Sequence, residues 1–266
     1  MKFKYIDLFA GIGGIRMPFQ EFGGECVFSS EWDKFSQITY EANFGKKPQG
    51  DITTIKESDI PSFDILTGGF PCQAFSVAGK KLGFQDTRGT LFFDIARILD
   101  FHKPKAFLLE NVKGLVGHNK KQTFHTICKT LRDTLGYNIT YRILNAKDFG
   151  VPQNRERIYI IGFKEPSDFE FPEPPYTPTK LGDILESKTD KIFTLTDHQW
   201  KYHQDRKAKM KAKGYGFGYS LFNEDSIYTS TISARYHKDG SEIVIAQRGK
   251  SPRNLTPREA ARLQGF

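Results

Sequence analysis

The chain has 266 residues, enough to bury a sizeable hydrophobic core, and its formal net charge of +8 suits an acidic partner such as nucleic acid. Its three cysteines, Cys26, Cys72 and Cys128, have no paired spacing and no neighbouring histidine cluster, which argues against a disulfide framework and against a metal site. No stretch approaches the roughly 18 apolar residues of a membrane span, and the N-terminus has no signal-like pattern. We therefore expect a cytoplasmic protein that makes no membrane contact.

Short apolar runs alternate with amphipathic segments in the first part of the chain. Four runs are typical of buried strands, each ending in a turn or polar cluster: residues 5–9, 26–30, 63–67 and 106–109. Apolar residues at helical spacing predict helices over 90–101 and 122–135. Two later runs, 137–143 and 157–163, are expected to extend the sheet and to include an antiparallel pair. This alternation predicts an α/β fold with a mainly parallel sheet covered on both faces.

The composition changes after residue 163. Residues 164–180 contain five prolines, which predicts an extended connector without helices. A lysine-rich stretch follows at 201–213, and shorter strand-like runs come at 226–234 and 242–246. We interpret this part as a second, smaller and less regular domain.

A glycine-rich turn follows the first predicted strand. The segment Asp7-Leu-Phe-Ala-Gly-Ile-Gly-Gly14 lets the backbone approach a ligand closely. Glu31 ends the second predicted strand, where an acidic side chain can hold ribose hydroxyls, and Trp32 beside it can stack on an adenine ring. Asp51 ends a third short segment and can accept from an adenine amino group. With Phe9, these residues predict a nucleoside pocket at the strand ends.

The class of ligand is narrowed by what the glycine turn lacks. The chain has no G-x-x-x-x-G-K-[ST] phosphate loop, which disfavours a nucleoside triphosphate. Its glycine spacing also departs from the G-x-G-x-x-G pattern of dinucleotide sites, which disfavours a nicotinamide oxidoreductase. A nucleoside-like ligand without a pyrophosphate fits better.

A thiol, an acid and two arginines are predicted at the same edge of the sheet. Cys72 follows the third predicted strand among turn-forming and polar neighbours, unlike Cys26 and Cys128, which fit apolar positions. A thiol with a pKa of about 8.5 needs nearby positive charge to act as a nucleophile. Glu110 ends the fourth strand, and Arg155 and Arg157 introduce the last one. Their common placement favours a catalytic site over solvated loops.

Six segments together resemble the carbon-5 cytosine-specific DNA methyltransferases, especially the bacterial restriction-modification enzymes. In the family's order, they are Asp-Leu-Phe-Ala-Gly-Ile-Gly-Gly, Gly-Asp-Ile, Gly-Gly-Phe-Pro-Cys-Gln, Glu-Asn-Val, Gln-Asn-Arg-Glu-Arg and Leu-Thr-Pro-Arg-Glu-Ala-Ala-Arg-Leu-Gln-Gly-Phe. The resemblance implies a Rossmann-like S-adenosylmethionine-dependent methyltransferase fold. It also implies three segments: a catalytic and cofactor-binding domain at 1–165, a linker and target-recognition domain at 166–250, and a segment at 251–266 that returns toward the catalytic domain.

The resemblance implies a role for each residue of the predicted site. Cys72 would add to carbon 6 of a cytosine extruded from the duplex, and Glu110 would engage ring nitrogen N3. Arg157 would contact the exocyclic oxygen O2, and Arg155 would help to hold the catalytic loop. The cofactor implied is S-adenosyl-L-methionine, in a site formed by Phe9, Ala10, Gly11, Ile12, Gly14, Glu31, Trp32, Asp51, Ile52, Gly69, Pro71 and Leu91.

Double-stranded DNA is the implied partner. The residues expected to contact it are Gln73, Ser76, Arg88, Phe217 and Thr231. The lysine-rich stretch at 201–213 is placed to track phosphates, although such a run is more often a solvated helix.

The sequence departs from the family at its end. The family continues beyond Leu-Gln-Gly-Phe with a motif that completes the cofactor pocket, whereas this chain stops at Phe266. This leads us to expect either a second polypeptide that supplies the missing part or a truncated product that binds cofactor weakly. Two further interpretations stay open: a DNA-binding remnant that is inactive alone, and an RNA cytosine methyltransferase.

Overall fold

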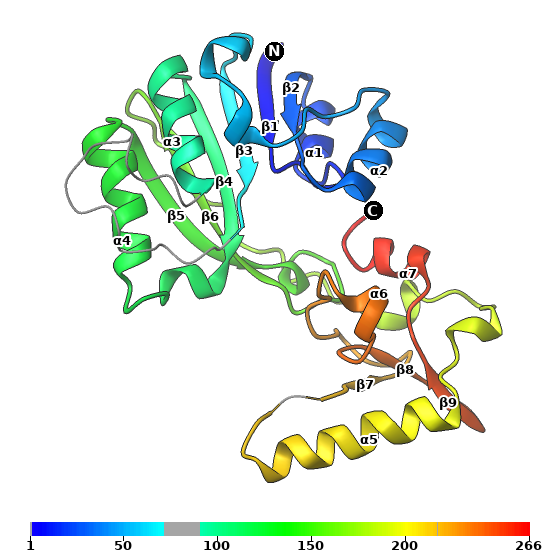
Figure 1. Cartoon of the computed structure of the whole chain (residues 1–266). Coiled ribbons are helices and arrows are strands. Elements are labelled where there is room, and N and C mark those ends of the chain that lie inside the picture. The colour runs from blue at the N-terminus through cyan, green and yellow to red at the C-terminus, as the bar shows by residue number, and fades with distance from the viewer. Residues whose placement is uncertain (1, 72–90, 217) are drawn as a thin grey trace. The chain divides into compact units, whose positions relative to one another are not determined.

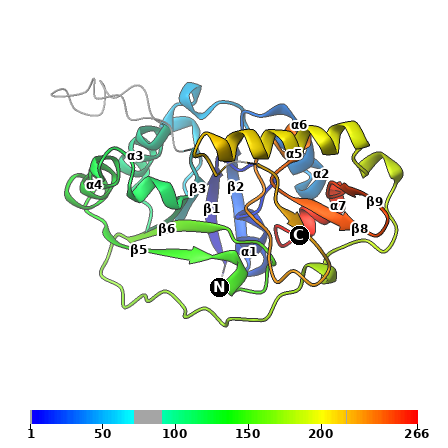
Figure 2. The ribbon, with the colours of Figure 1, turned by 90° about the horizontal axis from the view of Figure 1, so that it is seen from below.

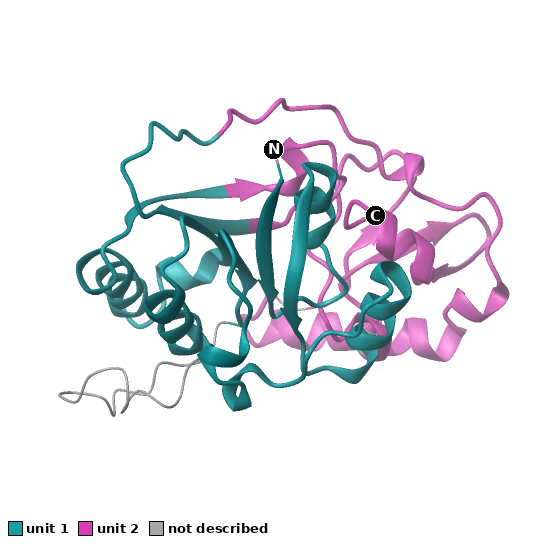
Figure 3. Ribbon diagram, turned by 90° about the horizontal axis from the view of Figure 1, so that it is seen from above, with its two compact units in different colours: residues 1–143, 157–171 teal, residues 144–156, 172–266 magenta. Residues whose placement is uncertain are grey.

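The structure is a computed structural model, drawn in Figure 1, and it describes residues 2–71, 91–216 and 218–266. The chain divides into two compact units (Figure 3). The first contains residues 1–143 and 157–171, and the second contains residues 144–156 and 172–266. The separate roles predicted for 1–165, 166–250 and 251–266 stay predictions.

A six-stranded sheet forms the centre of the first unit, with strand order β2-β1-β3-β4-β6-β5. Its strands are β1 (Phe3–Leu8), β2 (Gly24–Ser30), β3 (Ile65–Gly69), β4 (Ala106–Val112), β5 (Asn138–Asn145) and β6 (Glu156–Phe163). Strand β1 pairs in parallel with β2 and β3, and β3 pairs in parallel with β4, whereas β4 and β6 are antiparallel. The mainly parallel α/β sheet and the antiparallel pair are therefore confirmed.

The first unit has four α-helices among its described residues, and the periodicity of the sequence predicted the last two of them. They are α1 (Arg16–Glu21), α2 (Lys34–Phe44), α3 (Leu91–His102) and α4 (Gln122–Lys129). Helix α3 buries Phe92, Ile95 and Leu99, and it lies with α4 on the same side of β6 and β5 (Figure 2). The helix predicted over 122–135 occurs in two parts, because α4 continues into a π-helical turn at Thr130–Thr134.

The core of the first unit lies between this sheet and its helices. Ile6, Leu66 and Leu109 on the strands are fully buried. Each such side chain contributes about 1.5–3 kcal/mol relative to its exposed state. Gly162 on β6 pairs with Phe107 on β4, and a Cβ at Gly162 would lie 2.3 Å from the Phe107 ring. This glycine therefore lets the ring lie across the antiparallel pair, which carries two of the predicted site residues.

The second unit is less regular than the first. It contains the strands β7 (Leu221–Phe222), β8 (Val244–Gln247) and β9 (Lys250–Arg253) and the helices α5 (Asp197–Ala212), α6 (Tyr236–Asp239) and α7 (Pro257–Arg262). Its strands form a three-stranded sheet in the order β7-β8-β9. Ile243, Leu255 and Leu263 belong to its small core, and a buried ion pair joins Arg253 to Glu259 at 2.7 Å.

The structure confirms some of the predicted elements around this unit and corrects one. Residues 164–180 contain no helix, as predicted, and the run at 242–246 corresponds to β8. The strand predicted over 226–234 is wrong, because the segment is irregular apart from a bridge between Thr229 and Gln153. Its Thr229 amide donates to Pro152 O at 2.9 Å, so its hydrogen bonds go to a neighbouring loop instead of a sheet.

In the part of the chain that the structure describes, no helix combines the length and the apolar character needed to cross a bilayer.

Candidate active site

A pocket of about 230 Å³ lies at the ends of β1, β2 and β3, where a parallel sheet of this class binds ligands. Its lining consists of Phe9, Ser30, Glu31, Trp32, Gly50, Asp51, Ile52, Gly69, Pro71 and Leu91. Eight of these were predicted as cofactor residues, and Ser30 and Gly50 were not. The predicted residues Ala10, Gly11, Ile12 and Gly14 belong instead to the turn that supports Phe9.

The turn after β1 has an unusual backbone. Phe9 and Gly11 both have φ of +55°, and Gly13 has φ of +94°, so three of its residues are in the left-handed region. A Cβ at Gly13 would lie 2.1 Å from the ring of Phe44, which excludes a larger residue there. The turn is fastened to the end of β2 because the Ala10 amide donates to Ser30 O at 3.0 Å. The backbone thus presents Phe9 to the pocket at a conformational cost that the fold has to offset.

Glu31 connects the turn to the pocket wall. Its Oε2 accepts from the Gly11 amide and its Oε1 from the Asp33 amide, both at 2.8 Å, and the residue is 8% exposed. A carboxylate has about four acceptor positions, so these two bonds leave room for ligand hydroxyls. The Asp51 carboxylate also accepts a backbone hydrogen bond. Its Oδ1 accepts from the Thr53 amide at 2.9 Å and caps the turn Ile52–Thr54. Trp32 is 66% exposed and presents an aromatic surface at the pocket rim.

Asp7 lies beneath this turn in the middle of the sheet. The Thr67 hydroxyl donates to Asp7 Oδ1 at 3.1 Å, while Oδ2 is buried with no hydrogen-bond partner among the described residues. Burial raises the pKa of Asp7 to about 7, although the bond from Thr67 and the charge of Arg16 act in the opposite direction. The folded chain therefore holds a proton on this carboxyl that the unfolded chain releases at a lower pH.

We expect the Asp7→Asn protein to gain stability relative to the parent as the pH rises from about 4 to 7. Because the folded pKa of Asp7 is raised to about 7, the folded state binds more protons than the unfolded state in this window, and the parent loses stability as the pH rises through it. A shift of this size corresponds to roughly 4 kcal/mol. Denaturant titrations of both proteins at several pH values measure the difference, and parallel stability curves would contradict the assignment.

A carboxylate and a guanidinium meet beside the pocket. Strand pairing places Gly69 on β3 opposite Glu110 on β4, and Val112 on β4 opposite Arg157 on β6. Arg157 Nε lies 2.9 Å from Glu110 Oε1, and their side chains are only 14% and 21% exposed. A Cβ at Gly69 would lie 3.5 Å from Glu110 Oε2, so the carboxylate borders the pocket wall directly. The sequence predicted only that Glu110 and Arg157 lie at the same edge of the sheet. The antiparallel register of β4 and β6 brings them together as an ion pair.

Asn111 holds the chain segment that leads to Cys72. Its Nδ2 donates to Phe70 O at 2.7 Å, and the residue is 2% exposed. Successive strand residues point to opposite faces, so Asn111 faces away from Glu110. This bond fixes the main chain just before Pro71, the last described residue of the segment. Sequence reasoning missed Asn111, although it is the central residue of the Glu-Asn-Val motif.

Comparison with known proteins identifies the family of the chain. The family model for C-5 cytosine-specific DNA methylase matches residues 3–266. The chain belongs to this family. It is 60% identical over 271 residues to the type II methyltransferase M.SsoII of Shigella sonnei, covering 100% of this chain and 71% of that one. It is 42% identical over 279 residues to M.HhaI of Haemophilus parahaemolyticus, covering 99% and 84%.

Solved structures confirm the methyltransferase fold. The crystal structure of S. pombe Dnmt2 methyltransferase superimposes with a TM-score of 0.78 at 20% identity, covering 99% of this chain and 87% of that one. The sequence-based family assignment is thus confirmed, and with it the activity of a cytosine-5 DNA methyltransferase. The family favours DNA over the RNA alternative. The comparisons give no support to a second polypeptide.

Other predicted residues of the methyltransferase lie in its second unit or outside the described residues. The Arg155 amide donates to Asn145 Oδ1 at 2.9 Å, and the Thr231 hydroxyl donates to Asn154 O at 2.7 Å. The remaining predicted residues fall outside the described part of the chain: Cys72, Gln73, Ser76, Arg88 and Phe217.

Gln153 organises the second unit of the methyltransferase and was not predicted. It is fully buried, its Nε2 donates to Leu263 O at 2.7 Å, and its Oε1 accepts from the Ile232 amide at 3.1 Å. One side chain therefore joins the Gln-Asn-Arg-Glu-Arg motif to the Leu-Gln-Gly-Phe motif and to the segment that carries Thr231. The only sequence signal that could have pointed to Gln153 was its place as the first residue of the Gln-Asn-Arg-Glu-Arg motif.

Proposed function

We propose that this methyltransferase uses S-adenosyl-L-methionine to methylate carbon 5 of a flipped cytosine at a specific site in duplex DNA. The observation that carries the proposal is the placement of the Glu110–Arg157 ion pair against Gly69, a wall residue of the strand-end pocket. A pocket suited to a nucleoside and a charged pair suited to a pyrimidine ring thus adjoin in one unit.

The pocket's side chains fit the chemistry of the cofactor. Phe9 and Trp32 offer aromatic surfaces to an adenine ring, while Glu31 and Asp51 offer carboxylate oxygens to hydroxyl and amino groups. The residues of the turn, Ala10, Gly11, Ile12 and Gly14, would position Phe9 and Glu31. Gly69, Pro71 and Leu91 would face the methionine end, nearest Glu110. When bound, the cofactor supplies an electrophilic methyl group.

Trp32→Ala is expected to weaken S-adenosyl-L-methionine binding by roughly 5- to 150-fold, because stacking on an aromatic side chain contributes about 1–3 kcal/mol. Isothermal titration calorimetry measures the change in Kd. The matched control is Phe22→Ala, since Phe22 is also an exposed aromatic residue of the first unit and does not line the pocket. Equal affinities for the two variants would remove Trp32 from the cofactor site.

We assign the chemistry at the base to three side chains. The Cys72 thiolate would form a bond from sulfur to carbon 6, moving electron density from the double bond toward carbon 5 and the N3–O2 side of the ring. Glu110 would hold a proton at N3, and the Arg157 guanidinium would offset the charge that develops at O2. Once carbon 5 carries the methyl group that the bound cofactor would supply, loss of the carbon-5 proton and departure of the sulfur would restore the ring. Arg155 would steady the loop that carries Cys72.

The remaining segments would select and hold the DNA. In this proposal residues 166–250 read the target sequence, and residues 251–266 lead back toward the catalytic domain. The DNA contacts would come from Gln73, Ser76, Arg88, Phe217 and Thr231. The names of the relatives, type II methyltransferases, support a role in a type II restriction-modification system. We propose that the enzyme acts on DNA in the cytoplasm.

The test uses the chain as it is. Incubation with S-adenosyl-L-methionine labelled in its methyl group should transfer label to duplex DNA and not to transfer RNA. Mass spectrometry of the digested product should identify 5-methylcytosine, and bisulfite sequencing should place it at one short sequence. Label on RNA alone, or on adenine, would overturn the proposal.

A further inference from the structure

Helix α5 of the second unit is held in place along one side. Its N-terminus is closed by a capping box at Thr196, and none of its residues is buried. The Trp200 ring lies 4.5 Å from the Tyr219 ring, and Lys207 Nζ lies 4.2 Å from the centre of that ring. Lys207 also donates to Tyr219 O at 2.8 Å. These contacts fix the orientation of the helix and so determine which side chains face outward.

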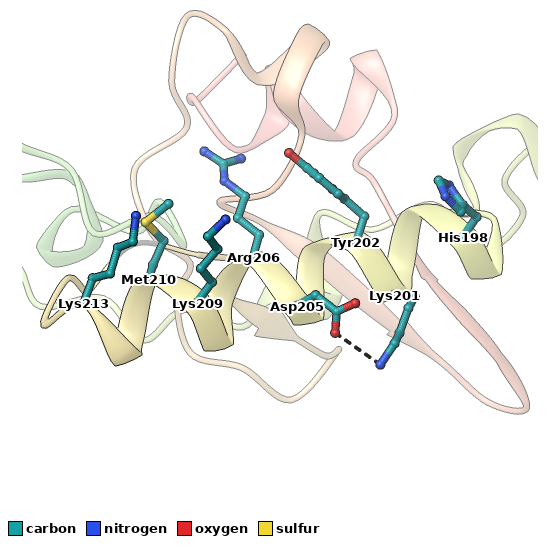
Figure 4. A pocket seen from close by; sticks show the side chains of 8 residues that line it. All are labelled: His198, Lys201, Tyr202, Asp205, Arg206, Lys209, Met210 and Lys213. Carbon is teal, nitrogen blue, oxygen red and sulfur yellow. Dashed lines mark ion pairs between the residues drawn. The ribbon is translucent and has the colours of Figure 1, made fainter.

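The opposite side of α5 gathers cations. We define the α5 basic face as Arg206, Lys209 and Lys213, flanked by the exposed side chain of Tyr202. At helical spacing these residues share one side, whereas Trp200 and Lys207 lie on the other. Figure 4 shows the four side chains of the face projecting to the same side of the helix, where they line a concavity of about 460 Å³.

The charge of this face is not neutralised within the described structure. Lys201 and Asp205 pair with each other at 3.2 Å, and they are drawn joined in Figure 4. Among the residues that the structure describes, no carboxylate forms a salt bridge with Arg206, Lys209 or Lys213. Residues 197–213 hold six Lys and Arg against two Asp, a local charge of +4 in a chain of +8. Half of the chain's net charge therefore lies on one exposed helix.

We propose that the α5 basic face binds backbone phosphates of the duplex that carries the target cytosine, outside the bases that are read. This inference rests on the proposed function and adds a sequence-independent part to its DNA affinity. The eight residues from Arg206 to Lys213 span about 10 Å along the helix axis. Phosphates of one strand repeat every 3.4 Å or so along the duplex axis, so about three fit this length, one for each cation.

The chemistry of the face favours a phosphate backbone over a folded protein surface. Arg206 can engage a phosphate through two parallel hydrogen bonds, and the lysines act as point charges. The Tyr202 hydroxyl adds a neutral donor of the kind found at phosphates. Apart from Met210, which is half buried, the concavity presents no aliphatic residue for an apolar partner.

The experiment measures salt dependence on mixed-sequence duplex DNA, so it needs no knowledge of the target site. We expect the triple variant Arg206→Gln, Lys209→Gln, Lys213→Gln to reduce the slope of log K against log salt by about 2.7, or about 0.9 for each phosphate that the variant no longer neutralises. Between about 50 and 200 mM salt, the affinity of the parent should then fall about 40-fold more than that of the variant.

The matched control removes the same charge elsewhere in the second unit. Lys188, Lys191 and Lys211 are exposed, and Lys211 lies one turn beyond Lys207 on the anchored side of α5. Replacing these three with glutamine should leave the slope close to that of the parent, and Arg206→Lys should keep it as well. Equal slopes for the two triple variants would overturn the inference. Failure of the proposed function would appear separately, as an absence of 5-methylcytosine in DNA treated with the parent protein.

Discussion

Cys72→Ser is expected to lower methyl transfer by on the order of 10⁴-fold or more and to abolish covalent capture of DNA that contains 5-fluorocytosine. A serine hydroxyl is a far weaker nucleophile than a thiolate, so it forms no bond to carbon 6. With 5-fluorocytosine the ring has no carbon-5 proton to lose, and the sulfur–carbon bond therefore persists. A shifted band on a denaturing gel measures this adduct, and single-turnover methylation measures the rate.

The two other thiols provide matched controls. Cys26 lies in β2 with Sγ 3.4 Å from Phe28 O, and Cys128 lies in α4 against the core. Burial raises the pKa of both thiols, which disfavours the thiolate form. Cys26→Ser and Cys128→Ser should therefore still form the adduct. Capture that persists in Cys72→Ser, or that disappears only in one of these two variants, would contradict the assignment of the nucleophile.

The fold of the first unit could be predicted from the sequence because each of its elements is specified by a pattern of neighbouring residues. Apolar runs of strand length and helices with one apolar face predict a parallel sheet. Glu31 directly follows strand β2, and Asp51 comes two residues after an isolated bridge at Gln49. Ser30 and Gly50 were missed because a serine at a strand end and a glycine in a turn carry no recognisable chemistry. Residues that act through shape or backbone at a pocket give little signal of their own.

Features that depend on register were less accessible. The Glu110–Arg157 pair requires the particular antiparallel alignment of β4 with β6, which no local pattern specifies. The strand predicted over 226–234 failed for a related reason. Its Ile, Tyr and Thr residues have strand propensity, but the Thr229 amide and the Thr231 hydroxyl donate to the carbonyls of Pro152 and Asn154. Tertiary hydrogen bonding there overrides local preference.

Glu110→Gln is expected to lower the rate of methyl transfer by roughly 10²- to 10⁴-fold, the range typical of a removed general acid or base. Glutamine keeps the size of the side chain and a hydrogen-bond acceptor for Arg157, but its amide N–H can only donate a hydrogen bond to ring nitrogen N3 and cannot transfer a proton to it. The negative charge that develops when sulfur adds to carbon 6 would then be offset by Arg157 alone. Adduct formation on 5-fluorocytosine DNA should slow in the same proportion, because the step that the substitution impairs, the addition of sulfur to carbon 6, precedes methyl transfer.

A second glutamate in the same unit separates this role from a structural one. Glu57 pairs with Arg97 at 2.8 Å and does not line the pocket, so Glu57→Gln removes a comparable ion pair without touching the proposed chemistry. If Glu110 acts on the base, Glu110→Gln alone should lose rate while both variants retain the cofactor Kd. A Glu110→Gln protein that methylates as fast as Glu57→Gln would show that the ion pair beside Gly69 serves only the strand pairing. Another group would then have to offset the negative charge that develops on the ring when the Cys72 sulfur adds to carbon 6.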